Sequence, residues 1–226
     1  MNRGLKVAVS WSGGKDSALS LFRAIRSGLH IHCLLNLINR DASRSMSHGL
    51  DPRLIAAQAE ALEIPIVQRK TTWETYEDEF KRAVVDLKQH GVSAVVFGDI
   101  DAGIEEHRDW IERVSAELEV RPISPLGGGT PQGLLTEFID AGFEAIVVCA
   151  KAELFGEEWL GRKMDEGFIQ ELQSKDFHPC GEMGEYHTLV TNGPIFKRRI
   201  DIIDSEKVLR EGYRFLDISS FALSPR

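Results

Sequence analysis

The sequence predicts an α/β protein with a doubly wound parallel sheet covered by helices on both faces, followed by a smaller α+β domain. Two observations support this prediction. In the first half of the 226 residues, short β-rich segments alternate with segments of helical period, the pattern of right-handed strand-helix-strand units. The run Gly127–Gly129 is the only marked change of composition, and strand-rich sequence returns after it. We therefore expect one domain at residues 1–124 and a second at residues 125–226.

The first domain is expected to contain four strands, each a short apolar run bounded by polar or glycine residues. They lie at Leu5–Ser10, His32–Leu37, Ile66–Arg69 and Ala94–Phe97. Four helices alternate with these strands, because apolar residues recur there at steps of three or four. A glycine follows the first and third helices, and a proline suits the first turn of the second. The helices are expected near residues 17–26, 52–61, 76–87 and 107–118.

The second domain has a less regular pattern. A helix is expected at Gln132–Asp140 and a strand at Ala145–Val148. Another helix is predicted by apolar residues that recur every four positions, namely Leu160, Met164, Phe168 and Leu172. A turn rich in glycine and proline, Pro179–Gly184, precedes strands at Tyr186–Val190 and Ile195–Ile203. We expect the last residues, 219–226, to form a loose tail.

Composition excludes several classes of protein. Hydrophobic residues make up 42% and charged residues 27%, which is typical of a globular domain. The net charge of −8 gives no overall basic field, so nucleic acid is not an expected partner. No segment approaches the roughly 20 apolar residues of a membrane span, and the first residues lack the apolar core of a signal peptide. Three cysteines without C-x-x-C spacing argue against a disulfide framework and a four-cysteine zinc site. We expect a cytoplasmic protein with no membrane partner.

The turn after the first expected strand has the chemistry of a phosphate-binding loop. It is the hexamer Ser12-Gly13-Gly14-Lys15-Asp16-Ser17, between a buried strand and the start of a helix. Backbone N–H groups, the positive end of the helix dipole and two serine hydroxyls would converge on an anion there, and Lys15 adds a positive charge. A Walker A loop and a dinucleotide-binding fingerprint are both excluded by the glycine spacing. An ordinary tight turn with a solvated lysine is the structural alternative.

The hexamer resembles the PP-loop of the ATP pyrophosphatases, Rossmann-like proteins of the adenine nucleotide alpha hydrolase-like superfamily. A second motif, Gly181–Val190 followed by Asn192–Phe196, resembles the signature of the diphthine–ammonia ligase family. The resemblance covers about residues 7–200. It implies a ligase of diphthamide biosynthesis that uses ATP, Mg²⁺ and ammonium to convert a carboxylate into an amide through an acyl-adenylate, releasing AMP and pyrophosphate. It also implies a protein acceptor similar to elongation factor 2.

The resemblance also implies site residues. The catalytic candidates are Lys15, Arg108, Glu182, Glu185 and Tyr186. The ATP-binding candidates are Ser12, Gly13, Gly14, Lys15, Asp16, Ser17, Asn36, His48 and Gly98, and Asp16 is also a candidate ligand of Mg²⁺. The two glutamates could hold Mg²⁺, orient ammonium or act as a base. Each candidate also has an ordinary structural explanation, such as a surface carboxylate of a turn or a solvated helical arginine.

Two positions depart from the family pattern and leave the acceptor open. Met183 stands where the family more often has glycine, and Gly127 stands where a tryptophan is usual. One alternative is a PP-loop enzyme that adenylates another acceptor, such as a tRNA base. Another is a nucleotide-binding sensor without turnover. Formation of AMP and pyrophosphate would distinguish the enzymes from the sensor.

Overall fold

The computed structural model describes residues 4–100, 105–174 and 178–226, and its first half is a five-stranded parallel sheet. The strand order is β3-β2-β1-β4-β5, so the chain starts in the middle and winds outward in both directions. This arrangement confirms the predicted α/β class. The strands are β1 (Lys6–Ser10), β2 (His30–Asn39), β3 (Ile66–Thr71), β4 (Ala94–Val96) and β5 (Arg121–Ile123). The short strand β5 was not predicted, since three residues interrupted by a proline have no clear period.

Helices cover both faces of this sheet, as its alternating side chains require. Val7 and Val9 of β1 belong to one core, and Ala8 belongs to a second core on the opposite face. The predicted apolar positions of the third and fourth helices, such as Phe80 and Ile111, lie in the second core. The helices are α1 (Lys15–Arg26), α2 (Pro52–Leu62), α3 (Tyr76–Gln89) and α4 (Glu105–Glu117). Pro52 begins α2 as expected, and the Asp51 side chain caps it.

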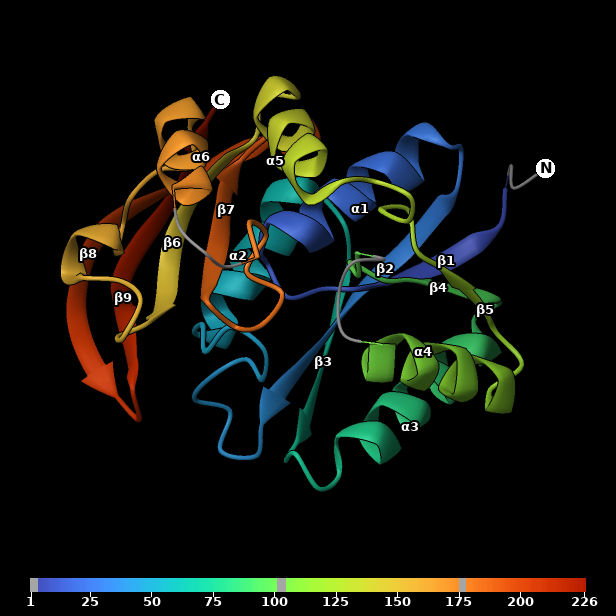
Figure 1. The fold of residues 1–226 in the computed structure, drawn as a ribbon. Helices are drawn as coiled ribbons and strands as arrows, with labels where there is room; N and C mark the ends of the chain where they lie inside the picture. Colours follow the sequence, from blue (N-terminus) through green and yellow to red (C-terminus); the bar gives the residue numbers. More distant parts are fainter. Residues whose placement is uncertain (1–3, 101–104, 175–177) are drawn as a thin grey trace.

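The second half of the chain forms an antiparallel sheet in the order β7-β6-β9-β8. Its strands are β6 (Glu144–Lys151), β7 (Tyr186–Asn192), β8 (Arg198–Arg210) and β9 (Tyr213–Pro225). Two helices accompany it, α5 (Pro131–Asp140) and α6 (Glu166–Gln173), with a 3₁₀ turn at Glu157–Trp159. Helices α1 and α2 lie between the two sheets, because α1 contacts β7 while α2 contacts β8 and β9 (Figure 1). The larger core therefore continues from one sheet to the other.

The helix predicted across Leu160–Leu172 is shorter than expected. Gly161 has a positive φ of 80°, and the helix begins only at Glu166, where the Asp165 side chain accepts a hydrogen bond from the backbone of Phe168. The preceding segment instead bonds to β6, because the N–H of Met164 donates to the carbonyl of Ala145. The period-four pattern was misleading, since Leu160 and Met164 are buried without being helical.

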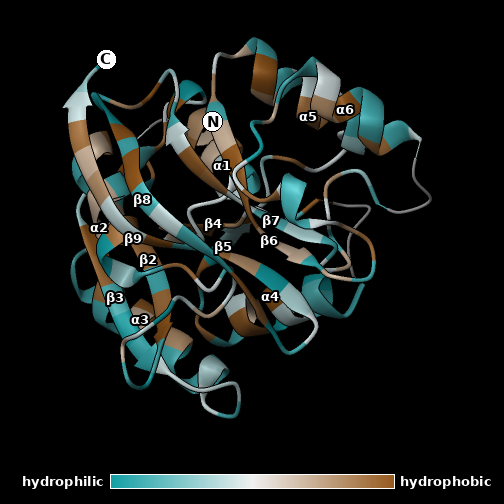
Figure 2. Cartoon of the chain, turned by 90° about the vertical axis from the view of Figure 1, so that its left-hand side faces the viewer, coloured by the Kyte–Doolittle hydropathy of each residue, from teal (hydrophilic) through white to brown (hydrophobic). Residues whose placement is uncertain are grey.

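The end of the chain corrects two further expectations. The strand expected at Ile195–Ile203 begins at Arg198 and continues to Arg210. The expected loose tail at 219–226 was wrong, since β9 pairs with β8 as far as Pro225. The two strands reverse at Glu211 and Gly212, both with positive φ. In Figure 2, polar and apolar stretches alternate along β8 and β9, which is typical of strands with one face exposed. Among the described residues, no helix combines the length and apolar character needed to cross a membrane.

Candidate functional site

The predicted phosphate loop is the turn that joins β1 to α1, and close approaches of other atoms require its two glycines and a third glycine that follows β4. Gly13 has a φ of 84°, and a Cβ there would lie 2.5 Å from the amide oxygen of Gln58. A Cβ on Gly14 would collide with the imidazole of His48. At the end of β4, a Cβ on Gly98 would lie 3.0 Å from the backbone nitrogen of Ser17. A side chain at any of these positions would fill or distort the turn.

The first turn of α1 has the donors that an anion requires. Within the described part of the chain, the backbone N–H groups of Asp16 and Ser17 have no hydrogen-bond acceptor. The hydroxyls of Ser12 and Ser17 lie 3.2 Å apart beside them. Unpaired N–H groups at a helix N-terminus, with the helix dipole behind them, form an anion site. The residues present therefore fit the phosphates of ATP.

Lys15 begins α1, and its ammonium group is buried and held by two acceptors. It donates to the carbonyl oxygen of Cys180 at 2.5 Å and to the carboxylate of Asp16 at 2.8 Å. Burial opposes the charge of Lys15, but attraction to Asp16 outweighs it and raises the pKa above its usual value. The ammonium also lies 5.2 Å from the centre of the Tyr186 ring. Lys15 is therefore charged and bonded to the turn that precedes β7, residues 179–185, which we call the C-terminal turn.

The C-terminal strand β7 completes the phosphate loop from the other half of the chain. The hydroxyl of Thr188 accepts a hydrogen bond from the Lys15 N–H at 3.1 Å, so it occupies one donor of the helix terminus. The N–H of Val190 donates to the carbonyl of Gly13 at 3.0 Å. These contacts bring the turn before β7 to the loop, although more than 160 residues separate them in the sequence.

Gln58 connects the phosphate loop to β7, and sequence reasoning missed it. Its side chain is fully buried, and its amide nitrogen donates to the carbonyls of Gly13 at 2.9 Å and Val190 at 2.8 Å. Its amide oxygen accepts the indole N–H of Trp11 at 3.1 Å. The one available signal was a polar residue four positions after Leu54 on the apolar stripe of α2. We call Gln58, together with its three partners, the glutamine clamp.

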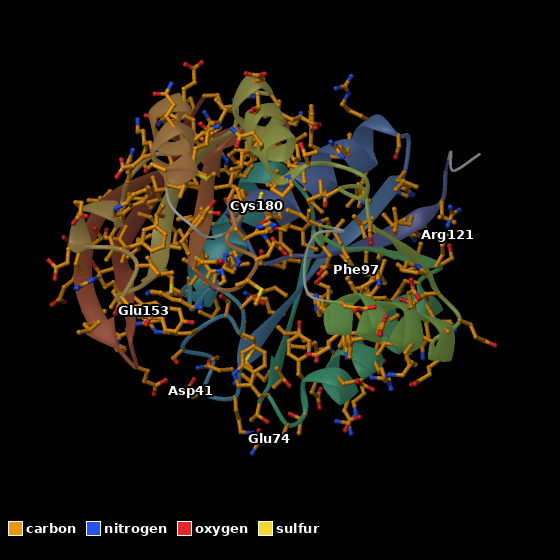
Figure 3. All side chains as sticks on the ribbon, in the orientation of Figure 1. Asp41, Glu74, Phe97, Arg121, Glu153 and Cys180 are labelled. Atoms are coloured by element: carbon orange, nitrogen blue, oxygen red, sulfur yellow. The ribbon has the colours of Figure 1, made fainter. Side chains whose placement is uncertain are left out.

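A cleft of about 560 Å³ opens over the phosphate loop and brings most of the candidates together. It lies at the carboxyl ends of the parallel strands, where sheets of this kind bind ligands. The predicted residues that line it are Ser12, Lys15, Asp16, Ser17, Asn36, His48, Gly98, Glu182 and Tyr186. Cys180 of the C-terminal turn and Phe97 at the end of β4, both labelled in Figure 3, also line the cleft.

Two of these residues make contacts that fix the cleft wall. The amide of Asn36 is buried and donates to the carbonyl of Trp11 at 2.9 Å, so it joins the ends of β1 and β2. The Nδ1–H of His48 donates to the carbonyl of Thr188 at 3.0 Å, and its ring stacks on His187 at 4.6 Å between centroids. Burial and the neighbouring His187 hold the pKa of His48 well below its usual value, and burial lowers the pKa of His187 to about 4. Both rings are neutral at pH 7.

The two candidate glutamates have different environments. Glu182 lines the cleft and also a neighbouring cavity of about 650 Å³. Burial and repulsion by Asp16 raise its pKa to about 7. The Glu185 carboxylate is buried and accepts the backbone N–H groups of Met183 at 2.8 Å and His178 at 3.2 Å. It therefore holds the turn together and does not line the cleft.

The remaining catalytic candidates also differ in position. Tyr186 is almost fully buried, and its hydroxyl donates to the carbonyl of Pro179 at 2.6 Å while its ring lines the cleft. Arg108 lies on α4, outside this cleft, and its half-exposed side chain lies 3.6 Å from Glu105. It lines the neighbouring cavity with Glu182. Among the described residues, no group of three or more potential ligands is placed to hold a metal ion.

Two family models, both of diphthamide synthase domains, together match most of the chain. Residues 5–122 match the model of the diphthamide synthase N-terminal domain, and residues 130–223 match that of the diphthamide synthase C-terminal domain. The diphthine–ammonia ligase of Rattus norvegicus is 28% identical, over 97% of this chain and 91% of that protein. The human diphthine–ammonia ligase is 27% identical, over 95% and 89%. A solved structure described as a predicted subunit of tRNA methyltransferase from Methanocaldococcus jannaschii is 17% identical, with a TM-score of 0.48, over 84% of this chain and 98% of that chain.

Proposed function

The chain belongs to the diphthamide synthase family, and we propose that it is an ATP-dependent carbon-nitrogen ligase that turns a carboxylate into an amide with ammonium. Its relatives are named diphthine–ammonia ligases, which supports this class of reaction. The observation that carries the proposal is the single cleft in which the phosphate loop meets the C-terminal turn. The acceptor must approach the α-phosphate to within about 3–3.5 Å, so both parts must line one space.

The chemistry explains why ATP is needed. A carboxylate is a poor acyl electrophile, since its leaving group would be oxide. Attack by a carboxylate oxygen on the α-phosphate breaks the bond to pyrophosphate and forms an acyl-adenylate. Ammonia then attacks the acyl carbon, the new C–N bond replaces the bond to AMP, and one proton is released. Residues 12–17 would bind the β- and γ-phosphates through the free N–H groups of α1 and the ammonium of Lys15.

Mg²⁺ fits the acidic side of this site. Magnesium is usually held by one or two carboxylates together with substrate phosphates, and Asp16 offers a partly exposed carboxylate beside the phosphate loop. A bound Mg²⁺ would neutralise charge on the leaving pyrophosphate. In this structure the Asp16 carboxylate pairs with Lys15, so we propose that phosphate binding frees Asp16 for the metal.

Glu182 is our proposed proton acceptor. A group with a pKa of about 7 is suited to take a proton near neutral pH, and Glu182 lines the cleft beside the phosphate loop. It would accept the proton released when ammonia displaces AMP. Tyr186 would instead position Lys15 through its ring. The turn above the loop would also exclude water, which could hydrolyse the adenylate.

We propose that the acceptor is a protein similar to elongation factor 2 and that the reaction takes place in the cytoplasm. The cleft opens at the surface, so an acceptor residue on a protein loop could enter it. The three cysteines are free and buried, which fits a reducing compartment. The net charge of −8 disfavours a nucleic-acid acceptor such as a tRNA base.

The test incubates the full chain with ATP, Mg²⁺, ammonium and elongation factor 2 that carries diphthine. We expect AMP and pyrophosphate in equal amounts, and a mass shift from acid to amide on the acceptor. Omitting ammonium should stop amide formation but still allow exchange of labelled pyrophosphate into ATP. Tight ATP binding without AMP, pyrophosphate or exchange would show a nucleotide sensor and contradict the proposal. AMP formation that requires tRNA in place of the protein would overturn the choice of acceptor.

A further inference from the structure

A second cavity lies beside the cleft, and the ligase chemistry proposed above uses only one of its residues. It has a volume of about 650 Å³ and is lined by Pro122 of β5, by Ser124 after this strand, by residues of α4 and by Glu182 of the C-terminal turn. The cleft reaches from β2 and β1 to the end of β4, whereas this cavity lies beyond it, over the ends of β4 and β5 at the edge of the parallel sheet (Figure 1). We call it the side cavity.

The cleft and the side cavity meet at three residues, since Asp99, His107 and Glu182 line both spaces. The Asp99 carboxylate lies 2.5 Å from the imidazole of His107, so these two side chains hold each other in place. Within the described part of the chain, no hydrogen bond fixes the Glu182 carboxylate, in contrast to that of Glu185. Glu182 is therefore the part of this boundary that can turn toward either space.

The charges of the side cavity favour a small cation. Its described lining has four carboxylates and one arginine, and this Arg108 already lies 3.6 Å from the carboxylate of Glu105. The lining stays net negative even when His107 is protonated, so it attracts cations and repels the phosphates of ATP. Since Mg²⁺ is bound together with the phosphates, ammonium is the small cation that remains among the reactants. The four carboxylates are those of Asp99, Glu105, Glu112 and Glu182.

The order of the reaction explains why ammonium needs an entrance of its own. Ammonia can react only after the acyl-adenylate has formed, when the nucleotide and the acceptor already occupy the cleft. The cleft has a volume of about 560 Å³, which suits one ligand of the size of ATP. A protein acceptor at the opening of the cleft would also close it to solvent, and this closure protects the adenylate from water. The third reactant must then arrive from another side.

We propose that the side cavity is the entrance through which ammonium reaches the acyl-adenylate, with Glu182 at its inner end. This proposal rests on the proposed ligase function and assigns a route to one of its substrates. Ammonium loses one proton to solvent in the side cavity, and a second proton is released when ammonia displaces AMP. The position of Glu182 suits the role proposed for it above, because the acceptor of that second proton must lie where ammonia meets the acyl carbon.

The first test reverses one charge of the side cavity. Glu112 is exposed and lines the side cavity but not the cleft, and the two arginines of α4 pair with other glutamates. Glu112→Lys should therefore leave folding and the phosphate loop intact. Glu153→Lys is the matched control, because Glu153 is an exposed glutamate after β6, on the opposite side of the molecule from α4 and β5 (Figure 3).

Both variants are assayed with ATP, Mg²⁺ and elongation factor 2 that carries diphthine, over a series of ammonium concentrations at constant ionic strength. We expect the KM for ammonium to rise about 3- to 10-fold in Glu112→Lys, the effect of one reversed charge near a largely aqueous space. Its kcat and its KM for ATP should stay those of the control. The difference in KM should shrink at about 1 M salt, where the screening length falls to about 3 Å.

The second test narrows the side cavity. Ser124 is exposed and lines it, so Ser124→Trp should obstruct the space without disturbing a core. An adenylate that ammonia reaches slowly is hydrolysed by water, so the yield of amide per AMP released should fall by about 2-fold or more. Exchange of labelled pyrophosphate into ATP precedes the ammonia step and should persist. Ser93→Trp, at an exposed serine before β4, is the control that keeps the parent yield, and thermal melting checks that all variants fold alike.

Three results would overturn the proposed entrance. The first is an equal KM for ammonium in Glu112→Lys and Glu153→Lys, which decides the matter even when Ser124→Trp does not fold. The second is an equal yield of amide per AMP in folded Ser124→Trp and Ser93→Trp. The third is a parallel rise in the KM for ATP in Glu112→Lys, which would assign the side cavity to the nucleotide.

Failure of the entrance and failure of the ligase are distinguished by the parent protein. Any of these three results with normal release of AMP, pyrophosphate and amide by the parent would remove the entrance and leave the ligase function standing. Absence of AMP and pyrophosphate from the parent itself would contradict the ligase, and the entrance with it.

Discussion

The phosphate loop and the C-terminal turn form opposite parts of one cleft but are built in different ways. The loop is local, because β1, two glycines and the start of α1 place its N–H donors within a few residues of each other. The turn is held by the Lys15 side chain from the other half of the chain and by its own buried carboxylate, Glu185. In the proposed function the loop would therefore bind phosphate through its backbone geometry, whereas the chemistry of the turn would depend on which carboxylate faces the cleft.

The largest effect is expected for Lys15→Ala. Among the described residues that line the cleft, Lys15 supplies the one buried positive charge, which would face the proposed phosphates. Loss of one such stabilising group typically lowers turnover by about 100- to 1,000-fold. Lys151→Ala is the matched control, since Lys151 also donates to a carbonyl of the turn, that of Met183, but is solvent-accessible and outside the cleft. Turnover of both variants is measured as the rate of AMP release at saturating ATP. Similar turnover in the two variants would remove Lys15 from the reaction.

The second prediction separates the two glutamates of the turn. Glu182→Gln should lower amide formation by about 100-fold and remove the rise in rate near pH 7, because the ionised carboxylate accepts a proton. The pH series is run at a constant concentration of free ammonia, so that ionisation of ammonium does not produce the rise.

Glu185→Gln is the matched change three residues away. It should retain the rise near pH 7 but lower the melting temperature, because an amide cannot accept from both backbone N–H groups. A persistent rise near pH 7 in Glu182→Gln would assign the base to another group.

The third prediction breaks the link between the two regions. Gln58→Leu removes all three bonds of the glutamine clamp and leaves buried carbonyls at Gly13 and Val190 with fewer partners. We expect the free energy of unfolding to fall by about 2–3 kcal/mol. Apparent affinity for ATP should also fall, because the loop loses its support. Gln173→Leu at an exposed position of α6 is the control, and denaturant titration compares the two. An unchanged midpoint for Gln58→Leu would show that the clamp is not needed.

The same contrast explains how much could be predicted from the sequence. The phosphate loop and the first four strand-helix pairs were predicted, because turn residues and helical period are local properties. The role of Glu185 was not, since Glu182 and Glu185 are the same residue type and only the folded turn directs one to the cleft and the other to backbone N–H groups. Gln58 was missed because Val190, one of its partners, lies 132 residues away. Strand β9 was missed although its alternating polar and apolar residues are typical of a strand with one exposed face.

The smallest effect is expected for the stacked pair His48 and His187, which joins the loop side to the turn side. Burial lowers the pKa of His187 to about 4, while an unfolded histidine titrates near 6.5. Between these values the unfolded chain binds more protons than the folded one, so the free energy of unfolding falls as the pH drops through this window. The stability that His187 contributes is fully present above about pH 6.5 and decreases by on the order of 2 kcal/mol toward about pH 4.5.

His187→Gln isolates this contribution, because glutamine does not titrate. The difference in unfolding free energy between the parent and His187→Gln should shrink or reverse as the pH falls from about 8 to about 4.5. Carboxylates with lowered pKa values, such as Asp51 and Asp217, titrate below this window and are present in both proteins, so they cancel in the difference. A difference that stays constant across the window would mean that His187 is protonated in the folded chain. The stacked pair would then carry a positive charge beside the phosphates, and acid would strengthen ATP binding where a neutral pair leaves it unchanged.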